Sequence, residues 1–141
     1  MVLDSHFIVT RALSGHEGAV SFRSVNYPNR YLRHAGYVVW LHEYANDALF
    51  QHDASFHVRR GFVQGAASGK DVQYLSLESV NYPSFFLQRN DGGAQASIKV
   101  HDFTANFEKS ATWKVTVDYK ALDIVNPGKR ATMAKEIDCR V

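Results

Sequence analysis

The chain has 141 residues, of which 45% are hydrophobic and 21% charged, and its formal net charge is +2 at pH 7. These proportions are near the averages of globular proteins, so they exclude a disordered chain and indicate one domain. The basic residues are scattered, which argues against a nucleic-acid partner, and no apolar run approaches the length of a membrane span. The single cysteine, Cys139, excludes an internal disulfide.

In chain order, the local patterns are those of strands and turns. Alternation of apolar and polar residues predicts strands at Ser21–Val25, Phe56–Arg60, Tyr74–Val80, Ser97–His101 and Trp113–Val117. Asn26–Asn29, Asn81–Ser84 and Asn90–Gly93 have the composition of turns, and Gly65–Gly69 that of a loop. No segment shows sustained helical periodicity, so an all-β chain is expected.

An internal repeat organises these strands. Residues 21–34 read SFRSVNYPNRYLRH and residues 76–89 read SLESVNYPSFFLQR, so that SVNYP recurs intact. Downstream, Phe50–Phe56 lines up with Phe107–Trp113. Units of roughly fifty residues are typical of folds built from supersecondary repeats. Repeat one is expected over about 20–65 and repeat two over about 74–117.

A third, fainter unit is predicted from the two ends of the chain. Asp4–Phe7 resembles Asp53–Phe56, and Ile124–Arg130 echoes the SVNYP segment with its tyrosine deleted. If the ends meet in space, residues 119–141 and 1–15 complete a third repeat within a single domain, 1–141. Aromatic residues at equivalent repeat positions are expected in the shared core: Tyr27, Tyr31, Phe56, Tyr82, Phe86 and Trp113.

The repeated segments resemble a known family. Ser24–His34 and Phe50–Phe56 are similar to the arabinofuranosidase B domain, which is carbohydrate-binding module family 42. The resemblance implies a β-trefoil of three pseudo-symmetric repeats, in which each repeat can carry a shallow pocket for an arabinofuranose side chain of arabinoxylan or arabinan. It implies binding without catalysis or a cofactor, in a module that belongs to or associates with an α-L-arabinofuranosidase.

In that family the pocket pairs a histidine with an aspartate, which the resemblance places at His34 and Asp53. A carboxylate can accept hydrogen bonds from sugar hydroxyls, and an imidazole can donate or accept one. The alternative is that Asp53 caps a turn and His34 merely ends a strand. The residue that follows the histidine in many family members is aromatic; here it is Ala35, and Tyr37 is the expected substitute.

Weaker candidates lie elsewhere. Trp40 does not recur in the repeats and is a possible sugar platform. In repeat two, Arg89 replaces the histidine and Ser110 the aspartate, which predicts an impaired pocket, while in repeat three only Asp4 remains. The seven histidines lack metal-ligand spacing, so no metal is expected.

Two other functions stay open at this point. The chain could be a β-trefoil that binds a protein partner and has lost the sugar, because two of its three pockets depart from the family pattern. A glycoside hydrolase needs two carboxylates about a cleft, and nothing places a second one beside Asp53. The absence of a basic, apolar leader and of disulfides points to the cytoplasm if the chain is whole, and to secretion if it was excised from an extracellular enzyme.

Overall fold

A computed structural model of the protein describes residues 6–65, 72–90, 95–117 and 129–133. In these ranges the chain forms ten strands and two short helices. The strands are β1 (His6–Arg11), β2 (Ala19–Ser24), β3 (Arg30–Ala35), β4 (Val38–Glu43), β5 (Phe56–Arg60), β6 (Val72–Ser79), β7 (Phe85–Gln88), β8 (Ser97–Val100), β9 (Trp113–Val117) and β10 (Lys129–Met133); the helices are α1 (Ala48–Asp53) and α2 (Ala105–Ser110). The expected all-β character is confirmed, since strands dominate.

The strands pair antiparallel and close on themselves. Seven of them form a ring in the order β2-β3-β4-β8-β7-β6-β5, with β5 returning to β2. The strands β1, β10 and β9 run from β2 round to β6 and complete a second circuit. Such closure leaves few unpaired strand edges, which would otherwise invite aggregation.

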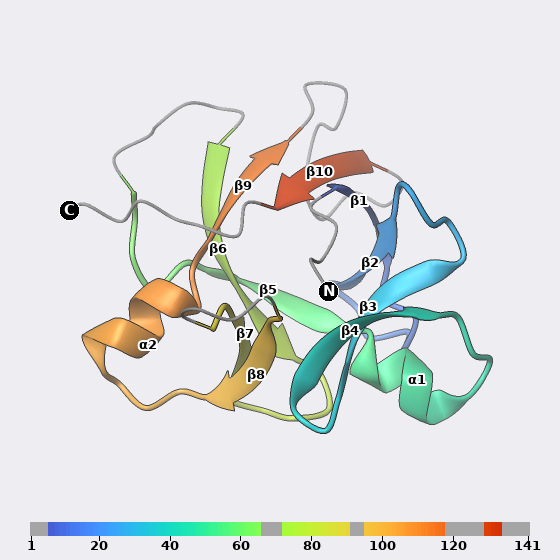
Figure 1. The fold of residues 1–141 in the computed structure, drawn as a ribbon, viewed down its shortest axis with the longest axis horizontal. Coiled ribbons are helices and arrows are strands. Elements are labelled where there is room, and N and C mark those ends of the chain that lie inside the picture. Colours follow the sequence, from blue (N-terminus) through green and yellow to red (C-terminus); the bar gives the residue numbers. More distant parts are fainter. Residues whose placement is uncertain (1–5, 66–71, 91–94, 118–128, 134–141) are drawn as a thin grey trace.

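The first and the last strands of the described ranges pair in this arrangement. His6 in β1 is paired with Thr132 in β10, and Val9 with Lys129. Figure 1 shows β1 in blue beside β10 in red. The N-terminal and C-terminal segments thus meet at these two strands, while Asp4 and most of the predicted third repeat lie outside the described residues.

The element order strand-strand-strand-helix-strand occurs twice, first as β2-β3-β4-α1-β5 and then as β6-β7-β8-α2-β9. Individual hydrogen bonds recur with it. In both SVNYP segments the serine hydroxyl accepts from the tyrosine amide: Ser24 from Tyr27 at 3.0 Å, and Ser79 from Tyr82 at 3.2 Å. The same residues thus fold the same turn in each repeat, with proline absent from the ladder positions.

The two helices were not expected from the sequence, which assigned these segments no helix. Each has six residues, and each begins at a side chain that caps its first turn. Asp47 Oδ1 accepts from the Phe50 amide at 2.7 Å, and Thr104 Oγ1 accepts from the Phe107 amide at 3.1 Å. A helix of this length is too short to show a 3.6-residue period, so the capping residue was its only local sign. No helix in the described ranges is both long and apolar enough to cross a bilayer.

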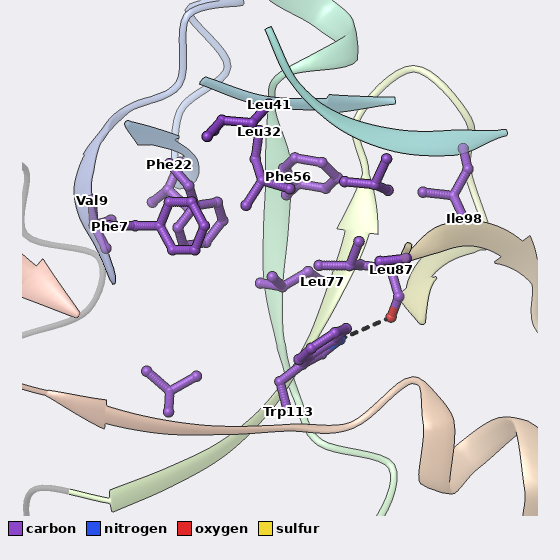
Figure 2. Close-up of a cluster of buried hydrophobic side chains, with 14 of the residues drawn as sticks. Phe7, Val9, Phe22, Leu32, Leu41, Phe56, Leu77, Leu87, Ile98 and Trp113 are labelled. Carbon is purple, nitrogen blue, oxygen red and sulfur yellow. Dashed lines mark hydrogen bonds between the residues drawn. The ribbon is translucent and has the colours of Figure 1, made fainter. Parts of the chain in front are cut away.

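Figure 2 shows the core, where side chains from both repeats interdigitate. Phe22 and Phe56 pack with ring centroids 6.2 Å apart, and Trp113 Nε1 donates to the Leu87 carbonyl at 3.0 Å. Phe56 and Trp113 lie in this core as expected, whereas Phe86 is buried in a separate cluster with Phe107 and Ala111, and Tyr31 is only half-buried. Tyr27 and Tyr82 are 57% and 38% exposed. The prediction for these two tyrosines was wrong because they occupy the turn before proline, which lies at the surface and not on a strand face.

Candidate functional site

His34 and Asp53 lie side by side. His34 is the fifth residue of β3, and Asp53 is the last residue of α1. His34 Nδ1 is 3.7 Å from Asp53 Oδ1, and both residues are buried, with exposed fractions of 3% and 4%. The α1 helix, which its capping residue fixes at the start, thus places the Asp53 carboxylate next to β3.

The Asp53 carboxylate is already engaged within the protein. Arg33 Nη2 donates to Oδ2 at 2.5 Å, and Asn81 Nδ2 donates to Oδ1 at 2.8 Å. The sequence analysis expected an open acceptor for hydroxyls. The structure instead places the carboxylate inward, where it holds Arg33 and Asn81, because a buried charge is stable only when paired and hydrogen-bonded.

These contacts determine the tautomer of His34. Since a carboxylate only accepts, Asn81 directs its NH₂ at Asp53 and its Oδ1 at His34 Nε2, 2.8 Å away. Nε2 therefore carries the proton, and it also lies 3.0 Å from the Ser79 hydroxyl. Nδ1 is left as an acceptor, and no described residue donates a hydrogen bond to it. Burial lowers the pKa of His34, partly opposed by its hydrogen bond to Asn81 and by the charge of Asp53, so the ring is neutral.

Three aromatic rings contact one another beside this cluster, and one of them, Tyr82, also contacts His34. The Tyr82 ring centroid is 4.9 Å from that of His34, and Tyr37 meets Tyr82 edge-on at 5.7 Å. Phe85 stacks on Tyr37 at 5.7 Å. We call Tyr37, Tyr82 and Phe85 the aromatic patch. Tyr37 is 54% exposed and Tyr82 38% exposed, so the patch presents rings to solvent directly beside buried polar atoms.

Tyr37 owes its position to a tight turn. Gly36 and Tyr37 form the two-residue connection between β3 and β4, and their φ angles are 59° and 64°. Positive φ at both central residues is the pattern of a type I′ hairpin turn. For a bulky residue such as Tyr37 this backbone is disfavoured, at a cost of about 1–3 kcal/mol. The turn is held from the neighbouring repeat, where the Ile98 amide donates to the Tyr37 carbonyl at 2.9 Å.

The weaker candidates do not join the cluster. Trp40 stacks on His42 with centroids 5.4 Å apart, and its Nε1 donates to the Ala35 carbonyl at 3.3 Å. It is therefore packed against its own hairpin, and the structure gives no support to a platform there. Asp4 lies outside the described residues.

The equivalent positions of repeat two carry a neutral version of the cluster. Gln88 corresponds to Arg33, and Ser110 to Asp53; the Ser110 hydroxyl donates to Gln88 Oε1 at 3.3 Å. The Arg89 guanidinium donates to the Lys109 carbonyl at 3.3 Å. This repeat therefore retains the contact between strand and helix while lacking the buried ion pair.

Three members of the site were missed by the sequence analysis: Arg33, Asn81 and Tyr82. Arg33 precedes His34 on a strand, so alternation predicts the opposite face, but its long side chain reaches the same carboxylate. Asn81 and Tyr82 belong to the SVNYP segment of repeat two and contact the histidine of repeat one. The recurrence of SVNYP marked these residues, but it could not tell which repeat they face. Within the described ranges, no group of three or more histidine, cysteine, aspartate or glutamate side chains is arranged to hold a metal ion.

Fold and site together define an all-β module built from repeats, in which two repeats share a polar cluster with an internal ion pair, and the exposed Tyr82 lies beside it. The sequence profile of the alpha-L-arabinofuranosidase B (ABFB) domain matches residues 2–115. The chain belongs to this family.

Solved structures show the same fold. A GH54 α-L-arabinofuranosidase soaked with a cyclic sulfate inhibitor is similar over 96% of this chain, with a TM-score of 0.58 and 18% sequence identity. An arabinofuranosidase in complex with arabinofuranosyl-α-1,2-xylobiose is similar over 80% of this chain, with a TM-score of 0.52 and 19% identity. The chain spans 23% and 20% of the length of these enzymes. No curated protein matches it in sequence.

Proposed function

We propose that the chain is a non-catalytic carbohydrate-binding module that recognises arabinofuranose-type side chains of polysaccharides such as arabinoxylan or arabinan. The observation that carries this proposal is the acceptor Nδ1 of His34, to which no described side chain donates, in a polar cluster of an ABFB domain beside the exposed ring of Tyr82. A sugar hydroxyl is a neutral donor of the right kind for this atom.

The charges of the cluster favour a neutral ligand. Arg33 and Asp53 form an ion pair at 2.5 Å, and His34 is neutral because burial lowers its pKa. The cluster thus offers hydrogen-bonding atoms without an uncompensated charge. A hydroxylated ring suits these atoms. An anion or a cation would find every opposite charge of the cluster already paired.

A binding role also fits the carboxylates. Retaining and inverting glycosidases both need two carboxyl groups on either side of the scissile bond. Asp53 is engaged by Arg33 and Asn81, and Asp47, which is close in sequence, caps α1. The share of the arabinofuranosidase structures that the chain covers is that of a module and not of a whole enzyme.

We further propose that the fold is a β-trefoil of the kind found in carbohydrate-binding module family 42. The duplicated strand-strand-strand-helix-strand order supports this, as does the six-strand circuit β1-β10-β9-β6-β5-β2, to which each full repeat contributes its first and last strands. In this proposal the third repeat consists of residues 119–141 and 1–15, with β10 and β1 as its two strands in the circuit.

The test is titration calorimetry with soluble arabinoxylan and with the same polymer stripped of its arabinose. The parent protein should bind the first and not the second. His34→Gln keeps a donor towards Asn81 but removes the Nδ1 acceptor, and should weaken binding about fivefold or more. Arg89→Gln, at the equivalent position of repeat two, is the matched control and should bind like the parent. Equal binding to both polymers, or none, would overturn the proposal.

The second candidate is a protein-interaction module that retains the scaffold without the sugar. One observation favours it: both oxygens of Asp53 already accept from partners inside the protein and the side chain is only 6% exposed, so little of this carboxylate is accessible to a ligand. The same titration separates the two, because an interaction module would show no heat with any arabinose-containing polymer while remaining folded by circular dichroism.

A further inference from the structure

We propose that the aromatic patch is a second sugar subsite, which binds the unit of the polysaccharide next to the arabinofuranose held at His34. This inference rests on the proposed function and adds that the protein contacts a second unit of the polysaccharide. Tyr82 lies between the two places: its ring centroid is 4.9 Å from that of His34 and 5.7 Å from that of Tyr37. The patch is therefore continuous with the polar cluster and extends outward from it.

The chemistry of the patch suits a sugar ring. Tyr37 and Tyr82 present flat apolar faces with a hydroxyl at the edge, and Phe85 stacks behind Tyr37 at an interplanar angle of 26°. A pyranose or furanose ring likewise has a face of C–H groups and an edge of hydroxyls. Aromatic side chains offer such contact area at a low entropic cost, because only two side-chain torsions are fixed.

The backbone presents Tyr37 in a fixed orientation. A bulky residue persists at positive φ only where its surroundings impose it, and such strain is concentrated at functional sites. Here Tyr37 has φ 64°, its carbonyl accepts from the Ile98 amide at 2.9 Å, and its ring contacts Tyr82 and Phe85. A ring held in this way while 54% exposed is preorganised for a ligand, which lowers the cost of ordering on binding.

The two repeats differ in this feature. Tyr27 is the counterpart of Tyr82 in repeat one, and it is 57% exposed with Arg30 over its ring at 5.5 Å. It has no contact with His34, so it offers a tyrosine of the same local sequence outside the patch. This makes Tyr27 the internal control for the inference.

The experiment compares two ligands by titration calorimetry: methyl α-L-arabinofuranoside, which has one ring, and arabinofuranosyl-xylobiose, which has further rings. The parent protein should bind the larger ligand about three- to tenfold more tightly. Tyr37→Asn removes the ring while keeping a residue that tolerates positive φ. It should abolish this gain, leave the affinity for the small ligand unchanged, and leave the urea unfolding midpoint equal or higher. Tyr27→Ala should retain the gain.

The outcomes separate the two proposals. If neither ligand binds, the proposed function fails and the subsite with it. If the parent binds both ligands equally, or if the gain survives in Tyr37→Asn, the protein is a sugar-binding module without this second subsite. A loss in Tyr37→Asn that is equal for both ligands also overturns the subsite, because the ring would then contact the arabinofuranose itself.

Discussion

Replacing the buried ion pair of repeat one by the neutral pair of repeat two tests how the cluster is held together. Asp53→Ser alone leaves the Arg33 guanidinium without its partner, and the two side chains are only 6% and 16% exposed. Breaking a buried pair costs about 3–5 kcal/mol of unfolding free energy, and the partial exposure of Arg33 favours the lower end, about 3 kcal/mol. Arg33→Gln alone leaves the Asp53 carboxylate without its cationic partner and should cost a similar amount of unfolding free energy.

The double substitution Arg33→Gln with Asp53→Ser recreates the pairing that Gln88 and Ser110 make at 3.3 Å. Its remaining cost is the acceptor lost by the Asn81 amide, about 1 kcal/mol. The double variant should therefore be about 1–2 kcal/mol more stable than Asp53→Ser, although it carries one more change. Such a coupling is in the usual range for residues in contact.

Urea unfolding of all four proteins at neutral pH, followed by tryptophan fluorescence and far-UV circular dichroism, measures this cycle. The slopes of the transitions must agree for the free energies to be compared. If the double variant is no more stable than Asp53→Ser, the contact between Arg33 and Asp53 does not stabilise the site. Asp53 would then act chiefly through Asn81.

Three further predictions concern pH, capping and packing. Burial lowers the pKa of His34, His42 and His57 below that of the unfolded chain, so protonation favours unfolding, and stability should be complete above about pH 6.5 and fall on acidification. Urea midpoints measured across this range should fall less steeply in His34→Gln than in the parent, and an equal slope in both would contradict a lowered pKa of His34. Thr104→Ala removes the cap of α2 and should cost about 1 kcal/mol, whereas Thr104→Ser should cost little; equal losses in thermal unfolding would refute a capping role. Gly61→Ala would place a Cβ 2.7 Å from Thr112 Cγ2 and 2.8 Å from the Tyr74 carbonyl oxygen, so a loss of about 1–3 kcal/mol is expected, and a neutral result would mean that β5 shifts freely.

The sequence predicted the strands better than the site. Alternation reports which residues face the core, so Trp113–Val117 and Phe56–Arg60 were placed within their observed bounds. The family motif correctly predicted that Asp53 and His34 lie next to each other. The burial of Asp53 could not be predicted, because it depends on a guanidinium from the neighbouring strand residue and on an amide 28 positions away.

The helices and the aromatic patch illustrate two different limits. A segment of six residues has too few turns to display a period, so α1 and α2 were visible only through Asp47 and Thr104. Tyr82 was assigned to the core because it recurs in both repeats, yet recurrence shows that a turn needs the residue and not that the residue is buried. Its contact with His34 joins different repeats, and a local pattern contains no information about that pairing.

The hydrogen bond between His34 and Asn81 has a consequence for how such a site can arise. Each copy of the duplicated unit supplies only half of the cluster, the histidine on one hairpin and the asparagine on the next copy's turn. A single unit would have to associate with another copy to form the cluster, so the fraction of units with a complete cluster would depend on concentration. Fusing the units in tandem makes that encounter intramolecular, so the fused chain forms a polar cluster that no single copy of the unit forms alone.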